Sequence, residues 1–492
     1  MLLVFALLLP IAFLLPEGEL DLGFTKLNFI TTEEILHPKI QEKKDISKIV
    51  AYVDTSGIDE GIAVSSSDKI DWKLENHRRL LRNRLKARSK PNRKSKYTSN
   101  KRKTSLEDLD AVLYLSSIAR KKLYSFFEKL EKVSEEKKKL HILHYGDSQI
   151  EGDRMTAFIR QRIQNQFGGN GPGLIPSMNV YATKTYVQNY SSNFYRYTCF
   201  RGEKLSSKKY GVMGAVSKFK TDTITNSNQA WVEIKPSNKA QSRSRYYNQV
   251  KLYYTECYTS CKVKVYHNDQ LILDDFLKSD GQFHILPLQF TDRVGKLKYY
   301  FESENSPTFC GFSLEGEYGV QVDNIGMRGS SGTFFRKLEK STFKGMMNDL
   351  NAELILLQFG GNSVPYFKDS SSVRRYARVF KSQIKTIKQL NPSAAIIVIG
   401  PSDMSKLSDG IYETYEYLPY CVSQMKKAVA TEGAGYWDLF KAMGGKNSMP
   451  SWVENGLAGR DYIHFTNKGA SIASQLFYDA LELELSNWQK KK

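Results

Sequence analysis

The chain has 492 residues, of which 41% are hydrophobic and 12% aromatic, and its formal net charge is +20. This composition excludes a wholly disordered chain and the length excludes a single small domain, so two domains with accessory segments are expected. The positive charge would attract nucleic acid, anionic lipid or acidic cell-wall polymers, and charge alone does not choose among them.

Residues 1–16, with the sequence MLLVFALLLPIAFLLP, are apolar without interruption. As a helix they would extend about 24 Å, slightly less than the roughly 30 Å of a bilayer's hydrocarbon core. No basic stretch precedes them and no small-x-small cleavage site is obvious. This pattern favours an uncleaved membrane anchor over a cleaved signal segment or a buried helix. Either export interpretation places the rest of the chain in the periplasm or the cell envelope.

Residues 17–105 are polar, weakly periodic and rich in charge, which predicts a largely disordered tether. Within it, residues 78–103 carry thirteen Lys or Arg and no Asp or Glu. Such a run is typical of a solvated tether and, less often, of an arm that binds polyanions. No helix-turn-helix, RNP-type or zinc-finger pattern lies beside it. We therefore expect contact with anionic wall polymer or membrane headgroups and no binding of nucleic acid.

Residues 106–178 show regular hydrophobic spacing. Apolar residues recur at helical spacing over 106–138, and LHILHYG at 140–146 has the composition of a short buried strand. DRMTAFIRQRIQNQF at 153–167 has its apolar residues on one side, as an amphipathic helix does. The pattern predicts a strand, a turn at Gly-Asp-Ser and a helix, which begin an α/β domain.

Residues 179–320 have a different character. Short segments such as AWVEIKP, QVKLYYTE and KLKYYFE are rich in Val, Ile, Tyr and Phe, and turn residues separate them. No helical stretch intervenes. Regular short strands with polar turns predict an inserted all-β sandwich.

The five cysteines match no zinc-binding pattern. CYTSC at 257–261 either closes a short hairpin turn with a disulfide or holds two thiols. An odd number of cysteines leaves at least one of them unpaired.

Residues 321–492 return to the α/β pattern. AELILLQFGG and AAIIVIGPS are near-continuous apolar runs, as strands covered on both faces must be. Helical stretches near 371–390 and 413–430 follow these runs, and a last helix follows HFTNKGA. We expect one α/β domain, built from 106–178 and 321–492, that is interrupted by the β-sandwich.

Four polar, glycine-bearing loops follow predicted strands of this domain. Reactive groups gather at the carboxyl ends of the strands in an open parallel sheet, so these loops are expected to meet at one edge. They are HYGDSQ (144–149), NIGMRGSSG (324–332), LQFGGNSV (357–364) and GRDYIHFTNKGA (459–470).

Together these loops hold each group that acyl transfer from an ester needs. Ser148 supplies a hydroxyl nucleophile, His464 a base for its proton, and Asp461 a carboxylate that orients the imidazole. The backbone N–H groups of Ser148 and Gly329 and the side-chain amide of Asn362 supply donors for the developing oxyanion. Each residue alone is compatible with an ordinary turn or surface position. Their joint occurrence after predicted strands favours catalysis.

These blocks resemble the SGNH (GDSL-type) serine hydrolases, which are named for Ser, Gly, Asn and His in four separated blocks. By this resemblance Ser148 in GDSQ is the nucleophile, and Asp461 and His464 in DYIH complete the triad. Gly329 and Asn362 correspond to the two middle blocks and to the oxyanion hole. The resemblance covers roughly 140–178 and 321–485, and it implies a flavodoxin-like, three-layer α/β/α fold.

The chain departs from the usual blocks at two positions. Gln149 stands where the GDSL motif has Leu, and Ser363 follows Asn362 where Asp is common. Neither change removes a group for proton transfer or oxyanion binding. Ser148 also lacks the Gly-x-Ser-x-Gly elbow of α/β-hydrolases, which argues against that fold.

A closer resemblance is to bacterial peptidoglycan O-acetylesterases, in which a carbohydrate-binding-type β-sandwich splits the SGNH domain after its first block. The expected insertion at 179–320 and the segment FGGNGPGL at 167–174 match that layout. The resemblance implies an acetyl ester on a cell-wall sugar as substrate, with the 6-hydroxyl of muramic acid as the expected position. The reaction would proceed through an acetyl-serine intermediate and require no metal or organic cofactor.

Three other functions stay open from the sequence. An O-acetyltransferase acting on glycan would need the same groups and would differ in excluding water and holding an acceptor. A catalytically vestigial wall-binding protein would use the basic tether and the β-sandwich. A lipid esterase or thioesterase is less favoured because no long apolar lid is apparent.

Arg328, beside Gly329, would either steer an acidic substrate or form an ordinary salt bridge.

Overall fold

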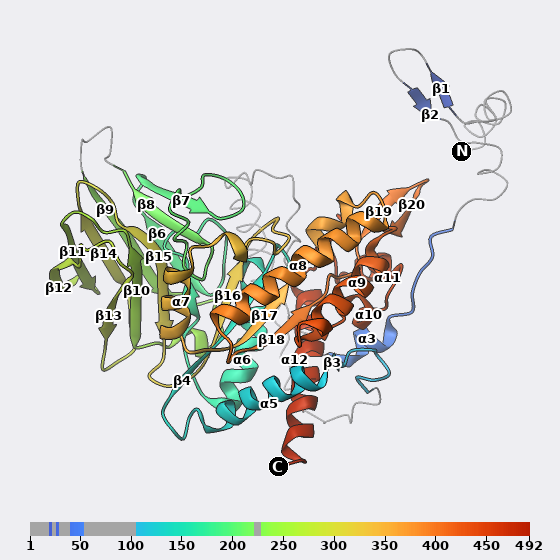
Figure 1. Cartoon of the computed structure of the whole chain (residues 1–492), viewed down its shortest axis with the longest axis horizontal. Helices are drawn as coiled ribbons and strands as arrows, with labels where there is room; N and C mark the ends of the chain where they lie inside the picture. The colour runs from blue at the N-terminus through green and yellow to red at the C-terminus, as the bar shows by residue number, and fades with distance from the viewer. Residues whose placement is uncertain (1–18, 22–25, 29–39, 54–104, 221–227) are drawn as a thin grey trace, which may run out of the picture.

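The computed structural model describes residues 19–21, 26–28, 40–53, 105–220 and 228–492 (Figure 1). The apolar segment 1–16 and the basic run 78–103 lie outside these residues. Within the described ranges, no helix is both long enough and apolar enough to cross a membrane.

A six-stranded sheet forms the centre of the α/β part. Its strands are β3 (Leu113–Tyr114), β4 (Lys139–Gly146), β16 (Gly319–Gly326), β17 (Ala352–Gln358), β18 (Ala395–Ile399) and β21 (Gly435–Trp437). They lie in the order β16-β4-β17-β18-β21-β3, and all but β3 run parallel. Counted along the chain from β4, the parallel strands have the order 2-1-3-4-5. This is the strand order of flavodoxin-like sheets.

Helices cover both faces of this sheet (Figure 1). One hydrophobic cluster packs α5, α6 and α12 against one face, and a second packs α7, α8 and α9 against the other. Along β17, Leu354 and Leu356 enter the first cluster while Ile355 and Leu357 enter the second, as the alternation of a strand requires. The helices are α5 (Ser117–Lys132), α6 (Thr156–Phe167), α7 (Lys340–Asp349), α8 (Ser370–Leu390), α9 (Leu418–Thr431) and α12 (Asn467–Gln489).

Between α6 and β16 the chain forms two antiparallel sheets, which lie to the left in Figure 1. One has the order β13-β10-β15-β8-β7 with β5 beside β15, and the other has the order β12-β11-β14-β9-β6. Their strands are β5 (Gly173–Ile175), β6 (Tyr186–Tyr190), β7 (Phe194–Thr198), β8 (Ala215–Phe219), β9 (Gln229–Pro236), β10 (Gln249–Thr255), β11 (Cys261–His267), β12 (Gln270–Leu277), β13 (His284–Gln289), β14 (Leu297–Glu302) and β15 (Thr308–Glu315).

Side chains from both antiparallel sheets share one hydrophobic cluster. The rings of Phe301 on β14 and Phe309 on β15 lie 4.5 Å apart between centroids, and so join the two sheets. The antiparallel pairing already includes β5, which precedes the expected boundary at residue 179. This strand has only three residues and follows a glycine-rich stretch, so its short apolar run gave no strand pattern.

All five cysteines are free thiols in the structure. Cys261 is the first residue of β11 and Cys257 lies in the turn before it; both are buried, and Cys257 Sγ lies 3.4 Å from the carbonyl oxygen of Thr259. CYTSC at 257–261 therefore holds two thiols in the structure and not a disulfide.

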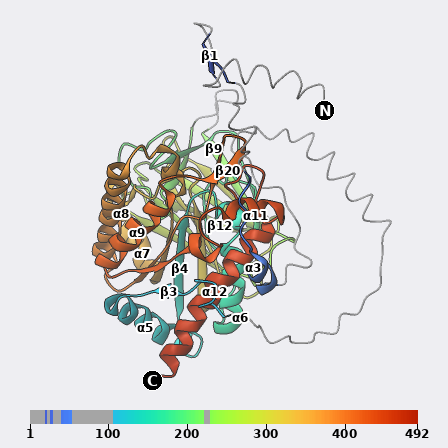
Figure 2. The ribbon, with the colours of Figure 1, turned by 90° about the vertical axis from the view of Figure 1, so that its right-hand side faces the viewer.

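Part of the expected tether packs on the α/β part, so the prediction of a tether over 17–105 is wrong for residues 40–53. Helix α3 (Ser47–Tyr52) lies beside α12 (Figure 2), and Ile46 and Ile49 join the first hydrophobic cluster. The side chain of Gln41 bonds both the N–H and the carbonyl of Tyr412. The polar composition of the segment concealed this contact because the apolar residues that make it are confined to one short stretch, 46–53.

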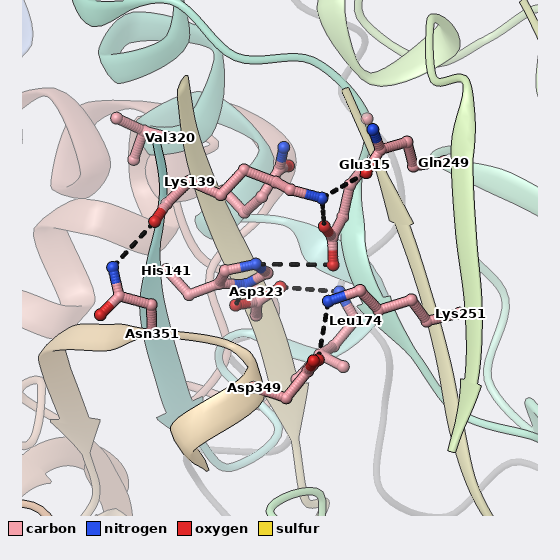
Figure 3. A network of polar contacts seen from close by, with 12 residues as sticks. Lys139, His141, Leu174, Gln249, Lys251, Glu315, Val320, Asp323, Asp349 and Asn351 are labelled. Carbon is pink, nitrogen blue, oxygen red and sulfur yellow. Dashed lines mark hydrogen bonds and ion pairs between the residues drawn. The ribbon is translucent and has the colours of Figure 1, made fainter. Parts of the chain in front are cut away.

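A buried polar network joins β4 to the antiparallel sheets (Figure 3). His141 Nδ1 on β4 lies 2.8 Å from Asp323 Oδ2 on β16, and its Nε2 lies 3.6 Å from Glu315 Oε1 on β15. Lys139 Nζ donates to Glu315 Oε2 at 2.7 Å and to Gln249 Oε1 on β10. Burial alone would lower the pKa of His141, but the two carboxylates raise it to about 9. A charged imidazole therefore holds two buried carboxylates together.

Candidate active site

Three neighbouring strands end at one level of the central sheet. Gly146 of β4, Gly326 of β16 and Gln358 of β17 lie in register at the carboxyl edge. Strand β4 lies where the strand order reverses, which is the position at which open α/β sheets bind ligands. The loops that carry Ser148, Gly329 and Asn362 leave the sheet at this edge.

Ser148, His464 and Asp461 form a continuous chain of polar contacts. Ser148 Oγ lies 2.8 Å from His464 Nε2, and His464 Nδ1 lies 2.7 Å from Asp461 Oδ2. Burial would raise the pKa of Asp461, but bonds from the His464 ring and from the N–H groups of His464 and Ile463 lower it overall. The ionised carboxylate therefore keeps a proton on Nδ1 and leaves Nε2 free to accept one from the serine.

The loop before α12 is folded so that the imidazole points back to the sheet. Asp461 Oδ1 accepts two backbone N–H groups of its own loop, and Tyr462 has a left-handed φ of 55°. Gly459 N–H donates to the carbonyl of His464 at 2.8 Å, which closes the loop. The Thr466 hydroxyl then accepts the N–H of Gly469 and caps α12. The Asp-x-x-His spacing thus places carboxylate and imidazole together through local bonds.

The three predicted oxyanion donors lie at the same pocket. In the described part of the chain, no acceptor is found for the backbone N–H of Ser148 or of Gly329. Asn362 Nδ2 donates to Asp147 Oδ2 at 2.9 Å and to the carbonyl of Ser330 at 3.2 Å. Both amide hydrogens of Asn362 therefore have acceptors, and an oxyanion must replace one of them.

Two further side chains connect the serine turn to the histidine loop. Gln149 Nε2 donates to the carbonyl of Ile463 at 2.7 Å, and its Oε1 accepts the N–H of Phe465 at 3.3 Å. Arg154 donates to the carbonyls of Ser148 and Phe465. Gln149, which the sequence presents as a neutral departure from the GDSL motif, therefore connects the two loops that carry the triad. The signal in the sequence for this role was the polar amide of Gln149 at a position that is usually apolar.

The triad opens into a pocket of about 300 Å³. Three arginines line it, namely Arg154, Arg201 and Arg328. Arg328 forms an ion pair with Glu151, so of the two roles expected for this residue the structure has the ordinary salt bridge. Arg201 comes from the loop after β7, which no sequence pattern connected to the site. Within the described ranges, no group of three or more His, Cys, Asp or Glu is arranged to hold a metal ion.

Comparison with known proteins gives structural likeness alone. No protein-family model matches the sequence, and no curated protein matches it. A solved structure described as a peptidoglycan O-acetylesterase in action is 20% identical, with a TM-score of 0.59 over 74% of this chain and 96% of that one.

Two further solved structures have much lower scores. An active-site mutant of a family two carbohydrate esterase from Clostridium thermocellum is 11% identical over 53% of this chain and 91% of its own, with a TM-score of 0.23. A putative GDSL-like lipase from Bacteroides ovatus is 9% identical over 62% and 98%, with a TM-score of 0.24. Likeness at that level does not establish a shared fold. The α/β domain that the resemblance to SGNH-type serine hydrolases implies is confirmed by the likeness to the solved peptidoglycan O-acetylesterase.

Proposed function

We propose that this protein is an SGNH-type serine esterase that removes O-acetyl groups from a cell-wall glycan, with peptidoglycan as the substrate. The observation that carries the proposal is the unbroken chain from Asp461 through His464 to Ser148, with contacts of 2.7 and 2.8 Å at the wall of an open pocket. The shared fold with a solved peptidoglycan O-acetylesterase supports the choice of glycan.

The proposed reaction has two halves that use the same groups. Ser148 Oγ attacks the acetyl carbonyl carbon while its proton moves to His464 Nε2. The N–H groups of Ser148 and Gly329, with the Asn362 amide, bind the oxyanion; one such donor contributes about 3–4 kcal/mol. The C–O bond to the sugar then breaks, and His464 gives its proton to the sugar oxygen. Water attacks the acetyl-serine by the reverse path and releases acetate.

The remaining parts of the chain have proposed roles consistent with this substrate. The antiparallel sheets over 179–320 would act as an inserted, carbohydrate-binding-like β-sandwich within an SGNH domain built from 106–178 and 321–492. Residues 1–16 would anchor an exported protein in the cell envelope, facing the periplasm. The basic run 78–103 would contact anionic wall polymer or membrane headgroups. The carbohydrate-binding role is what the resemblance to peptidoglycan O-acetylesterases implies, and the roles of residues 1–16 and 78–103 follow from their composition and charge pattern.

The direct test is acetate release from purified, naturally O-acetylated peptidoglycan, with acetylated xylan as the comparison glycan. We expect release from peptidoglycan and a fall of about a thousandfold or more in Ser148→Ala, because the nucleophile is lost. Ser382→Ala on α8 removes a hydroxyl remote from the pocket and serves as the matched control. Equal rates for parent and Ser148→Ala on an aryl acetate would favour a wall-binding protein without catalysis. Acetyl transfer to an added acceptor sugar in place of acetate release would favour the transferase.

A further inference from the structure

The charges around the pocket are unevenly paired. Arg154 is partly buried, and its guanidinium donates to the carbonyls of Ser148 and Phe465. Arg328 is half-buried, and both of its bonded nitrogens meet the carboxylate of Glu151. These two arginines therefore serve the fold of the site and have little capacity left for a ligand.

Arg201 differs from both of them. Its guanidinium makes no hydrogen bond or ion pair with any residue in the described part of the chain, and its side chain is exposed. Its backbone is nevertheless held, because the Thr198 hydroxyl donates to the Arg201 carbonyl and Thr198 N–H donates to the Glu203 carbonyl at 3.0 Å. An anchored loop thus presents an unpaired cation to the pocket.

The guanidinium lies directly over a predicted oxyanion residue. A Cβ built on Gly329 would come within 2.5 Å of Arg201 Nη1 and 2.7 Å of Cζ. Gly329 itself has a left-handed φ of 76°, which favours glycine at this position. The antiparallel part of the chain therefore places a positive charge beside Gly329, a predicted oxyanion donor.

We propose that Arg201 binds an anionic group, a carboxylate or a phosphate, carried by the acetylated sugar, so that the preferred substrates are acidic saccharides. This inference builds on the proposed esterase function. A planar guanidinium offers paired N–H donors that match either group, and an arginine without an internal partner has those donors free. Because Arg201 lies on the loop after β7, the antiparallel part of the chain takes part in selecting the substrate.

The experiment compares three matched sugar acetates. They are 6-O-acetyl-N-acetylglucosamine, which is neutral, its 3-O-lactyl ether 6-O-acetyl-N-acetylmuramic acid, which adds one carboxylate, and 6-O-acetyl-N-acetylglucosamine 1-phosphate. The quantity measured is kcat/KM for each acidic sugar divided by kcat/KM for the neutral one. We expect at least one ratio well above one, and the larger ratio identifies carboxylate or phosphate as the recognised group. Arg201→Gln should lower that ratio about tenfold, mainly through KM, and Arg201→Glu should lower it further.

Lys204→Ala is the matched control, because Lys204 is an exposed cation of the same loop that does not line the pocket. This variant should keep the parent's ratio. Raising the salt from 0.05 to 0.5 M should lower the ratio for the parent but not for Arg201→Gln, since screening weakens an exposed charge pair.

Two results would overturn the inference alone. One is equal kcat/KM for the neutral and acidic sugars in the parent. The other is an equal fall on all three sugars in Arg201→Gln, which would mean that Arg201 acts on the oxyanion of every substrate. Absence of acetate release from any sugar by the parent would instead remove the proposed esterase, and the substrate assignment with it.

Discussion

At the scale of single residues, Gln149 and Arg154 explain how the serine turn and the histidine loop keep their spacing. The triad distance depends on two segments that are separated by 316 positions in the chain. Gln149 bonds the carbonyl of Ile463 and the N–H of Phe465, the two neighbours of the histidine. Movement of about 1 Å between reacting groups can cost about a hundredfold in rate. A side chain that grips both neighbours is therefore a positioning residue.

Replacing Gln149 by Leu, the residue of the GDSL motif, tests this role. We expect kcat on an aryl acetate to fall about tenfold with little change in KM. The reason is that the change disturbs the alignment of Ser148 with His464 and leaves substrate binding intact. The variant should also lose about 1–3 kcal/mol of stability, since the carbonyl of Ile463 is left without its donor. Gln149→Glu, which keeps the shape and one acceptor, should give an intermediate kcat. A lowered unfolding midpoint with unchanged kcat would make the role purely structural.

Most of the candidate site was predictable from local and topological rules. Asp-x-x-His spacing predicted a carboxylate beside an imidazole, and loops after parallel strands were expected to share one edge. Arg201 was not predictable, because no period or motif relates a loop of an inserted sheet to a pocket of another sheet. The hydrogen bonds of Asn362 were not predictable either. They depend on where Asp147 and Ser330 lie once the strands are in register.

At the scale of elements, α3 is a short helix that the α/β part holds by few contacts. Ile49 is 5% exposed and enters the cluster that also contains α12. A six-residue helix is not stable alone in water, so its order depends on this packing. The long strands and helices were predictable because they repeat one pattern many times. Helix α3 offered too short a pattern to distinguish it from the polar segment around it.

Truncating Ile49 measures what the docking of α3 contributes. Ile49→Ala should lower the free energy of unfolding by about 2–5 kcal/mol, the range for truncating a buried aliphatic side chain to Ala, or by less if α3 detaches locally. Urea unfolding gives the first quantity, and the rate of limited proteolysis before residue 54 reports detachment. Lys48→Ala, one position earlier and exposed, should change stability by less than about 0.5 kcal/mol. Identical proteolysis and stability in the two variants would contradict docking.

At the scale of the whole molecule, the network around His141 connects the central sheet to the antiparallel sheets at the end of β4 remote from Ser148 (Figure 3). Its imidazole faces the carboxylates of Asp323 and Glu315, and Lys139 also pairs with Glu315. Nearby on the same interface, Lys251 on β10 pairs with the carboxylate at the end of α7. Together with a hydrophobic cluster that contains side chains of both parts, this charged contact joins the part that carries Arg201 to the part that carries Gly329.

Deprotonating His141 should weaken that contact. Its folded pKa of about 9 lies above the unfolded value of about 6.5, so its stabilisation is complete below about pH 6.5 and is lost as pH rises through about 9. The loss should be on the order of 3 kcal/mol, measured by urea unfolding between pH 6 and pH 9.5. His141→Gln should be less stable than the parent at pH 6 and approach it at pH 9.5. His267→Gln on β11, outside the network, should follow the parent's profile. Parallel profiles for parent and His141→Gln would show that the imidazole carries no charge in the fold.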